Sequence, residues 1–148
     1  MRTVSRNALV PYSAPQMYAL VDDIESYPEF LPWCDQAEVR ARSEHQVEAT
    51  IHLRRGGLTK SFTTRNRLQP PEIIALDLLS GPFRKLRGQW KFQALAANAC
   101  KVSLHLEFDF DNRLTDMLFG SFFESTCNSL VDAFTRRAHD IYGVPVVD

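Results

Sequence analysis

Residues 100 to 110 read CKVSLHLEFDF, and apolar and polar side chains alternate without a break along this stretch. Every even-numbered side chain from Cys100 to Phe110 is apolar, while Lys101, His105 and Glu107 are among the polar odd-numbered ones. Successive side chains of a strand point to opposite faces of a sheet, so the pattern indicates a strand with one buried and one solvated face. Such half-buried strands are typical of antiparallel sheets.

The spacing of apolar residues changes directly after this strand. Between residues 114 and 141 they recur every three or four positions, which is the period of a helix with one buried side. Asn112 is a suitable N-cap and Gly143 a suitable end. At 1.5 Å per residue, a helix from 113 to 142 is about 45 Å long and crosses a whole sheet. The expected buried stripe comprises Leu114, Leu118, Phe122, Phe123, Thr126, Leu130, Phe134, Ala138 and Ile141.

Upstream of residue 100, strand-like alternation begins near residue 36. Arg55-Gly56-Gly57 supplies a hairpin turn between two of the expected strands. Strands are expected at residues 47–54, 58–68, 73–79 and 86–94, with a weaker opening strand at 3–10.

Two short helices are expected after the opening strand. Ser13 and Gln16 form a capping box, and Pro15 stands in the first turn, where its missing N–H costs nothing. Residues 26–33, SYPEFLPW, are too rich in proline for a long helix and too apolar for an ordinary loop, which favours a packed helical turn. The order predicts an α+β fold in one domain, residues 1–148: a curved antiparallel sheet of about six to seven strands wrapped on a long C-terminal helix.

Length and composition narrow the class of protein. A chain of 148 residues has the size of one domain, and its 45% hydrophobic and 24% charged residues fit a globular protein. No stretch resembles a signal peptide or approaches the roughly 18 apolar residues of a membrane span. We therefore expect a cytoplasmic protein, with attachment to the surface of the inner membrane as the alternative. Cys34, Cys100 and Cys127 are widely spaced and expected to be reduced and buried.

Motifs for catalysis or metal binding are missing from the sequence. The four histidines have no metal-ligand partner three or four residues away, and no GxSxG, Walker, GxGxxG or HExxH motif occurs. Asp22, Asp23 and Glu25 form an acidic group that is expected to be solvated. Cys34 has no neighbouring histidine to activate it. The sequence predicts no enzyme activity, no metal site and no required cofactor.

Aromatic residues are the more informative group. They gather on the short helical turn, on two strands and on the long helix, where they either pack as a core or line a tunnel for a long apolar molecule. For any single aromatic residue the core is the more frequent outcome. If the sheet curls away from the helix, the expected cavity residues are Tyr27, Phe30, Leu31, Trp33, Trp90, Phe92, Phe108, Phe122 and Phe123.

Charge is unevenly distributed along the chain, although the net charge is only -1. Residues 54 to 91 carry nine basic and two acidic side chains, a local net of +7. This segment is either a set of solvated outer strand positions or a positive face for RNA or a membrane surface, and the first interpretation is favoured. The candidate face comprises Arg54, Arg55, Lys60, Arg65, Arg67, Arg84, Lys85 and Arg87.

The segment SAPQMYALVDDIESYPEFLPWC, residues 13–34, resembles the opening signature of the START-like family, which covers polyketide cyclases/dehydrases and lipid transport proteins. The stretches GPFRKLRGQWKF at 81–92 and FDF at 108–110, followed by FGSFF at 119–123, resemble the same family. The similarity is greatest to its subgroup of ribosome association toxins (RatA) and mitochondrial coenzyme Q-binding START-domain proteins. It spans nearly the whole chain and implies a helix-grip fold.

The resemblance leaves three classes of function open. The first is a non-enzymatic carrier of a quinone or lipid, with ubiquinone as the bound ligand and a role in respiration. The second is a ribosome association toxin that binds the large ribosomal subunit, blocks subunit association and has an antitoxin protein as a further partner. The third, a polyketide cyclase or aromatase, is disfavoured because no inward-facing pair of carboxylates or histidines is apparent.

Overall fold

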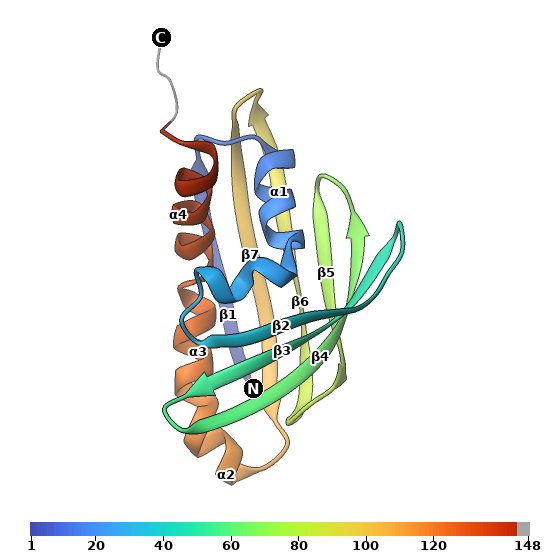
Figure 1. Ribbon diagram of the computed structural model, residues 1–148, viewed down its shortest axis with the longest axis vertical. Helices are drawn as coiled ribbons and strands as arrows, with labels where there is room; N and C mark the ends of the chain where they lie inside the picture. The colour runs from blue at the N-terminus through green and yellow to red at the C-terminus, as the bar shows by residue number, and fades with distance from the viewer. Residues whose placement is uncertain (145–148) are drawn as a thin grey trace.

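The computed structural model describes residues 1–144. Seven strands form one antiparallel sheet in the order β1-β7-β6-β5-β4-β3-β2, and the helices pack on one side of it (Figure 1). The strands are β1 (Arg2–Val10), β2 (Cys34–Arg42), β3 (Gln46–Arg55), β4 (Leu58–Gln69), β5 (Ile73–Ser80), β6 (Phe83–Ala96) and β7 (Ala99–Phe110). The helices are α1 (Ala14–Asp22), η1 (Ile24–Glu29), α2 (Arg113–Thr115), η2 (Asp116–Gly120), α3 (Ser121–Asn128) and α4 (Leu130–Tyr142). The α+β architecture expected from the sequence is confirmed.

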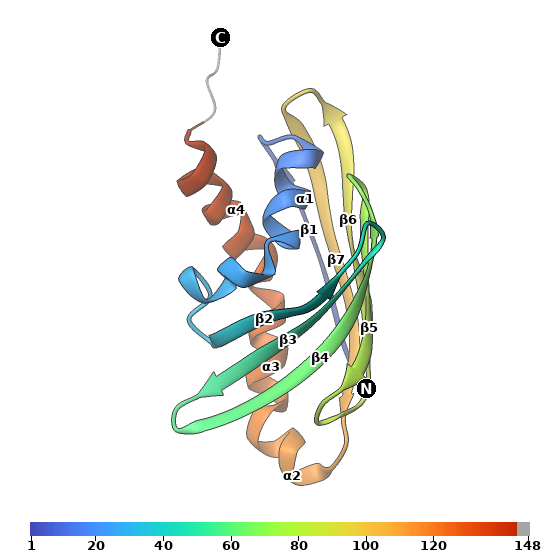
Figure 2. The same ribbon diagram turned by 45° about the vertical axis from the view of Figure 1, so that its right-hand side comes forward.

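The sheet is strongly curved, and Figure 2 shows β2, β3 and β4 curling toward the helices. Register shifts interrupt three of the six strand pairings, and such bulges bend and twist a sheet. One of them separates Thr63 from Thr64 in β4. Gly88 allows the backbones of β6 and β7 to approach each other closely, because a Cβ at this position would lie 2.1 Å from the His105 carbonyl oxygen of β7. The curvature creates a concave face on which a helix and a ligand can both fit.

Strand β7 has the alternation that its sequence indicated. Cys100, Val102, Leu104, Leu106, Phe108 and Phe110 are all 5% exposed or less. The strand lies between β1 and β6, so both of its edges are paired. A central strand with one fully apolar face anchors the core.

The N-terminal helix begins as its capping box predicted. The Ser13 hydroxyl accepts from the Gln16 backbone N–H at 3.2 Å, and the Gln16 side chain accepts from the Ser13 N–H at 2.9 Å. Met17 and Val21 are buried beneath α1. The proline-rich segment that follows contains the 3₁₀ helix η1, which agrees with the expected short helical turn.

The C-terminal helical segment spans residues 113–142 as expected, but it is interrupted. Ser129 separates α3 from α4, where the Ser129 hydroxyl donates to the Thr126 carbonyl at 2.7 Å and competes with the helical ladder. Nearer its start, η2 is a π-helical turn. Among residues 1–144, no helix has both the length and the apolarity to cross a bilayer.

The predicted buried stripe is wrong at both ends of this segment. Leu114 and Leu118 are 65% and 41% exposed, while Thr115 and Phe119 are buried in their place. The buried face is offset by one residue, about 100° around a helix, next to a π turn that departs from the 3.6-residue period. Ile141, in the last turn of α4, is 52% exposed.

Candidate functional site

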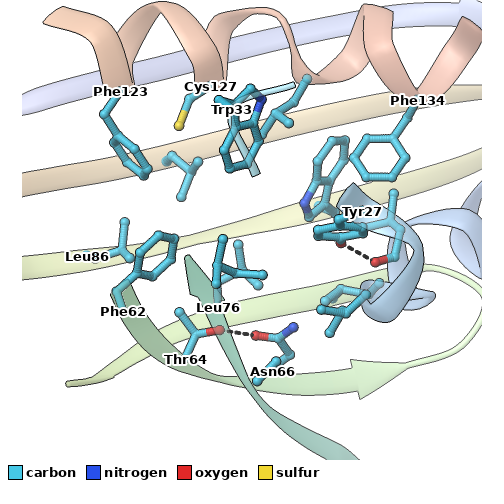
Figure 3. Close-up of a pocket in the computed structure, with 18 residues that line it drawn as sticks. Tyr27, Trp33, Phe62, Thr64, Asn66, Leu76, Leu86, Phe123, Cys127 and Phe134 are labelled. Carbon is cyan, nitrogen blue, oxygen red and sulfur yellow. Dashed lines mark hydrogen bonds between the residues drawn. The ribbon is translucent and has the colours of Figure 1, made fainter. Parts of the chain in front are cut away.

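A cavity lies between the concave face of the sheet and the helices. Figure 3 shows Phe123, Cys127 and Phe134 facing it from the helical side, opposite residues of the sheet. The sheet contributes Ala49, Ile51, Phe62, Thr64, Asn66, Ile74, Leu76, Leu86, Trp90 and Leu106. The helices and the segment after η1 contribute Val21, Ile24, Tyr27, Trp33, Phe123, Cys127, Leu130 and Phe134.

The cavity volume is about 90 Å³. Pockets that hold drug-sized ligands measure roughly 300–1,000 Å³, so the space seen here is too small for a whole lipid. A ligand with a long tail would need the wall between sheet and helices to move, or its tail to leave the cavity.

Aromatic side chains form one end of the cavity. The Phe134 ring lies 5.4 Å from Tyr27 and 5.3 Å from Trp90, with interplanar angles of 72° and 82°. Such edge-to-face contacts favour fixed ring positions. The Tyr27 hydroxyl donates to the Val21 carbonyl, and burial strongly raises the Tyr27 pKa. Tyr27 therefore stays neutral and serves as part of the wall.

Two polar side chains from β4 interrupt the apolar wall. Thr64 and Asn66 are each 7% exposed, and the Thr64 hydroxyl donates to Asn66 Oδ1 at 2.8 Å (Figure 3). This hydrogen bond occupies the amide oxygen of Asn66 and not its amide nitrogen. Trp90, which is 4% exposed, adds an indole N–H to the cavity wall. The cavity therefore presents hydrogen-bond donors to whatever occupies it.

The cavity offers little for acid–base or nucleophilic chemistry. None of its lining residues is a carboxylate, histidine, lysine or arginine. Burial strongly raises the pKa of the Cys127 thiol, so this side chain is not a thiolate at neutral pH. Outside the cavity, burial raises the pKa of Cys34 to about 11, and all three cysteines are free and buried as expected. Residues 1–144 also contain no group of three His, Cys, Asp or Glu side chains placed to hold a metal ion.

Four of the nine cavity residues expected from the sequence line the cavity: Tyr27, Trp33, Trp90 and Phe123. The structure places the other five elsewhere. Phe108 is fully buried and packs against Phe123 and Phe83, at centroid distances of 4.8 and 6.2 Å, in a solid aromatic core. Phe92 and Leu31 are also core residues, and Phe92 lies 5.5 Å from the Tyr18 ring.

The remaining two of the five, Phe30 and Phe122, pack against the core but do not line the cavity. The Arg137 guanidinium lies over the Phe30 ring at 4.9 Å, and the Arg55 guanidinium lies 5.5 Å from the Phe122 ring. Both rings are only partly buried, and contact with a cation stabilises that position. Aromatic character alone could not separate these positions from the cavity wall.

Sequence reasoning missed most of the sheet side of the cavity. The largest omission is the inward face of β4, where Phe62, Thr64, Asn66 and Leu68 alternate with the outward Arg65 and Arg67. The alternation itself contained the signal, because it places Thr64 and Asn66 on the same face as two apolar residues. A polar residue at a buried position is more informative than another aromatic residue.

The basic segment does not form a bare positive face. Six of its eight candidate residues pair with carboxylates, most of them from neighbouring strands: Arg54 with Asp35, Arg65 with Glu48, Arg67 with Asp77, Arg84 with Asp109, and both Lys85 and Arg87 with Glu107. Arg55 and Lys60, at the β3–β4 hairpin, have no carboxylate partner among residues 1–144; Arg55 donates to the Leu118 carbonyl instead. The solvated interpretation therefore fits most of this segment.

Comparison with known proteins gives one matching family and a set of relatives. The family described as polyketide cyclase / dehydrase and lipid transport matches residues 10–135. The ribosome association toxin RatA of Escherichia coli K12 is 44% identical over 142 residues, 96% of this chain and 90% of that protein. RatA of Vibrio cholerae is 46% identical over 143 residues, 97% of this chain and 99% of that protein. A mitochondrial coenzyme Q-binding protein of Drosophila melanogaster is 25% identical over 150 residues, 99% of this chain and 62% of that protein.

Solved structures show the same fold. The ZhuI aromatase/cyclase of a Streptomyces species superposes with a TM-score of 0.82 at 18% identity, covering 93% of each chain. An 18 kDa protein of Caulobacter crescentus superposes with a TM-score of 0.73 at 28% identity, covering 97% of this chain and all of that one.

Proposed function

The chain belongs to the polyketide cyclase/dehydrase and lipid transport family, and from that membership and its cavity we propose a non-enzymatic protein that binds a hydrophobic ligand. The ligand proposed is ubiquinone or a related isoprenoid lipid, held between the sheet and the C-terminal helices in support of respiratory electron transport. The observation that carries this proposal is the cavity wall: it is aromatic and aliphatic, and none of its residues is charged.

Physical chemistry favours a ligand with a ring and a tail. Burying isoprenoid carbon contributes about 0.8 kcal/mol per CH₂, so an apolar wall binds it without any motif. The volume of about 90 Å³ is smaller than the ~150 Å³ cavity that binds benzene, so even the ring requires the cavity wall to move. The tail then occupies space that opens when the helices or strands move apart. The similarity to a coenzyme Q-binding protein supports the same ligand class.

Native mass spectrometry of the protein purified from its own host, followed by organic extraction, tests this proposal. We expect a bound quinone or isoprenoid lipid. The matched control is Ala49→Leu, which adds bulk to the cavity wall and should be purified without ligand. A wild-type protein that is empty, and that takes up no added ubiquinone, would contradict the proposal.

Ribosome association is a second candidate, because relatives 44–46% identical over almost the whole chain have the name ribosome association toxin. The activity proposed is binding to the large ribosomal subunit, which prevents subunit association. Arg55 and Lys60 are the best contacts to RNA phosphate on the candidate basic face, since they have no carboxylate partner among residues 1–144. The other six basic residues of this face would have to break their ion pairs with carboxylates in order to bind RNA.

Sucrose gradients of lysates after overexpression test the second candidate. We expect fewer 70S particles and more free subunits with the wild-type chain. Arg55→Gln with Lys60→Gln should abolish the change, while Arg65→Gln with Arg67→Gln removes the same charge from paired positions and should preserve most of it. An unchanged profile with the wild-type chain would remove this candidate.

A further inference from the structure

Asn66 and Thr64 are polar side chains in a cavity wall that is mostly apolar. Across the sheet, Asn66 lies opposite Val47 of β3 and Leu76 of β5, and both neighbours are apolar. A buried amide donor without an acceptor is destabilising, because it loses its hydrogen bonds to water. The side chains of these two neighbours contain no acceptor for the Asn66 amide.

The orientation of the Asn66 amide is set by its neighbour on the same strand. The Thr64 hydroxyl donates to Asn66 Oδ1 at 2.8 Å, which occupies the amide oxygen. The amide nitrogen then lies on the side away from Thr64, as Figure 3 shows. Thr64 thus acts as a positioning residue that holds one donor of Asn66 ready for an acceptor in the cavity.

We propose that Asn66 Nδ2 is the head-group recognition site of the cavity and donates to a carbonyl oxygen on the ring of the bound ligand. This inference rests on the proposed binding of a hydrophobic ligand and specifies its class: a flat apolar ring with a carbonyl, such as a quinone or an aromatic ketone. The indole N–H of Trp90, which also lines the cavity, is a second donor, and it suits a ring with two carbonyls.

The same wall disfavours two other classes of apolar ligand. A fatty acid would bring a carboxylate into a cavity that contains no lysine, arginine or histidine, and an unpaired buried charge is strongly unfavourable. A pure hydrocarbon would leave the Asn66 donor unpaired. A neutral ring carbonyl satisfies the donor and leaves the apolar wall in contact with carbon.

The test compares two small probes of nearly the same shape, duroquinone and durene, which differ in the two carbonyl oxygens and have no isoprenoid tail. Dissociation constants for both are measured by titration calorimetry with the wild-type chain, Asn66→Leu, Thr64→Val and the control Arg65→Gln. Taking the ratio of the two affinities in each protein, and comparing it with the wild-type ratio, cancels the different hydration of the probes. We expect Asn66→Leu to lower the duroquinone/durene ratio about tenfold, equivalent to about 1.4 kcal/mol.

Thr64→Val should lower the ratio by a smaller factor, because the amide remains but loses its fixed orientation. Arg65→Gln changes the outward face of the same strand and should leave the ratio unchanged. The ligand-free Asn66→Leu variant should unfold near the wild-type temperature, because the leucine gains apolar contacts while the Thr64 hydroxyl loses its acceptor. A lower unfolding temperature with an unchanged ratio would show that the pair is structural and would overturn the inference.

Failure of this inference differs from failure of the proposed function. If both probes bind the wild-type chain and Asn66→Leu leaves their ratio unchanged, the cavity binds apolar ligands but Asn66 does not select them. If neither probe nor ubiquinone binds the wild-type chain, the proposed function fails, and the inference fails with it.

Discussion

Polar side chains on the two faces of the sheet differ in charge and in their partners. On the convex face of β4, Arg65 and Arg67 lie 3.1 and 3.0 Å from Glu48 and Asp77 of the neighbouring strands. On the concave face of the same strand, Asn66 lies between them in sequence, and its amide oxygen accepts from the Thr64 hydroxyl at 2.8 Å. The outer face therefore carries charged side chains that pair with carboxylates. The inner face carries two neutral polar side chains that pair with each other in the cavity wall.

This difference separates polar residues that only solvate a surface from candidates for ligand binding. Paired charges on an exposed face contribute little to stability and give no indication of a partner. Polar side chains in a mostly apolar cavity wall are candidates for contact with a ligand. Variants on the two faces should therefore differ in both the size and the kind of their effects.

The largest effect is expected on the concave face, where Phe108 is fully buried. Phe108→Ala removes contacts with Phe83, Phe110 and Phe123 and should lower the free energy of unfolding by about 3–5 kcal/mol. Urea unfolding measures this loss in the free energy of unfolding. Arg65→Ala on the convex face is the control, with an expected loss of about 1 kcal/mol or less. Equal losses would abolish the distinction between the faces.

A change in binding with little change in stability is expected where the concave face borders the cavity. Ala49 lines the cavity and is 1% exposed, and Ala49→Leu should lower ligand affinity at least about tenfold while the free energy of unfolding changes by about 1–3 kcal/mol at most. Titration with ubiquinone and urea unfolding give the two quantities. The exposed Ala41 of β2 provides the control Ala41→Leu, which should change neither. Unchanged binding in Ala49→Leu would place the ligand elsewhere.

A smaller effect depends on pH. Burial raises the pKa of Cys34 to about 11, so the folded protein holds this thiol proton more tightly than the unfolded chain. The stabilisation is complete below the thiol pKa of the unfolded chain, about 8.5, and is lost as pH rises toward the folded value. Urea unfolding between pH 7.5 and 10.5 should show a falling free energy, with a shallower fall in Cys34→Ala. Identical slopes in the two proteins would mean that Cys34 is not the group responsible.

The smallest effect is expected for an ion pair on the convex face. Arg67 and Asp77 are 61% and 47% exposed, and a double-mutant cycle with Arg67→Gln and Asp77→Asn should give a coupling of about 0–1 kcal/mol. The coupling should decrease between 0.05 and 0.5 M salt, because exposed charges are screened. A salt-independent coupling well above this range would show that the outer pairs do more than solvate the sheet.

Local sequence was sufficient wherever one strand or helix turn sets its own pattern. The alternation of residues 100–110 predicted β7 and its buried face, and Ser13 with Gln16 predicted the start of α1. The same reasoning failed at Leu114 and Leu118, where a π turn lies beside the offset buried face. Cavity residues were also predicted by aromatic character. The prediction therefore included Phe108, which lies in the core, and Phe122, which is partly buried outside the cavity.

The sequence by itself determined the elements, their order and the side of each strand that is buried, because these depend on residues close together in the chain. Only the tertiary structure decided which buried side chains line the cavity, since that depends on sheet curvature and on where the helices cross it. It also decided that the +7 segment is largely neutralised, because Arg87 meets Glu107 across 20 residues of chain. The register between antiparallel strands brings Arg87 and Glu107 together, and the sequence around either residue does not predict that register.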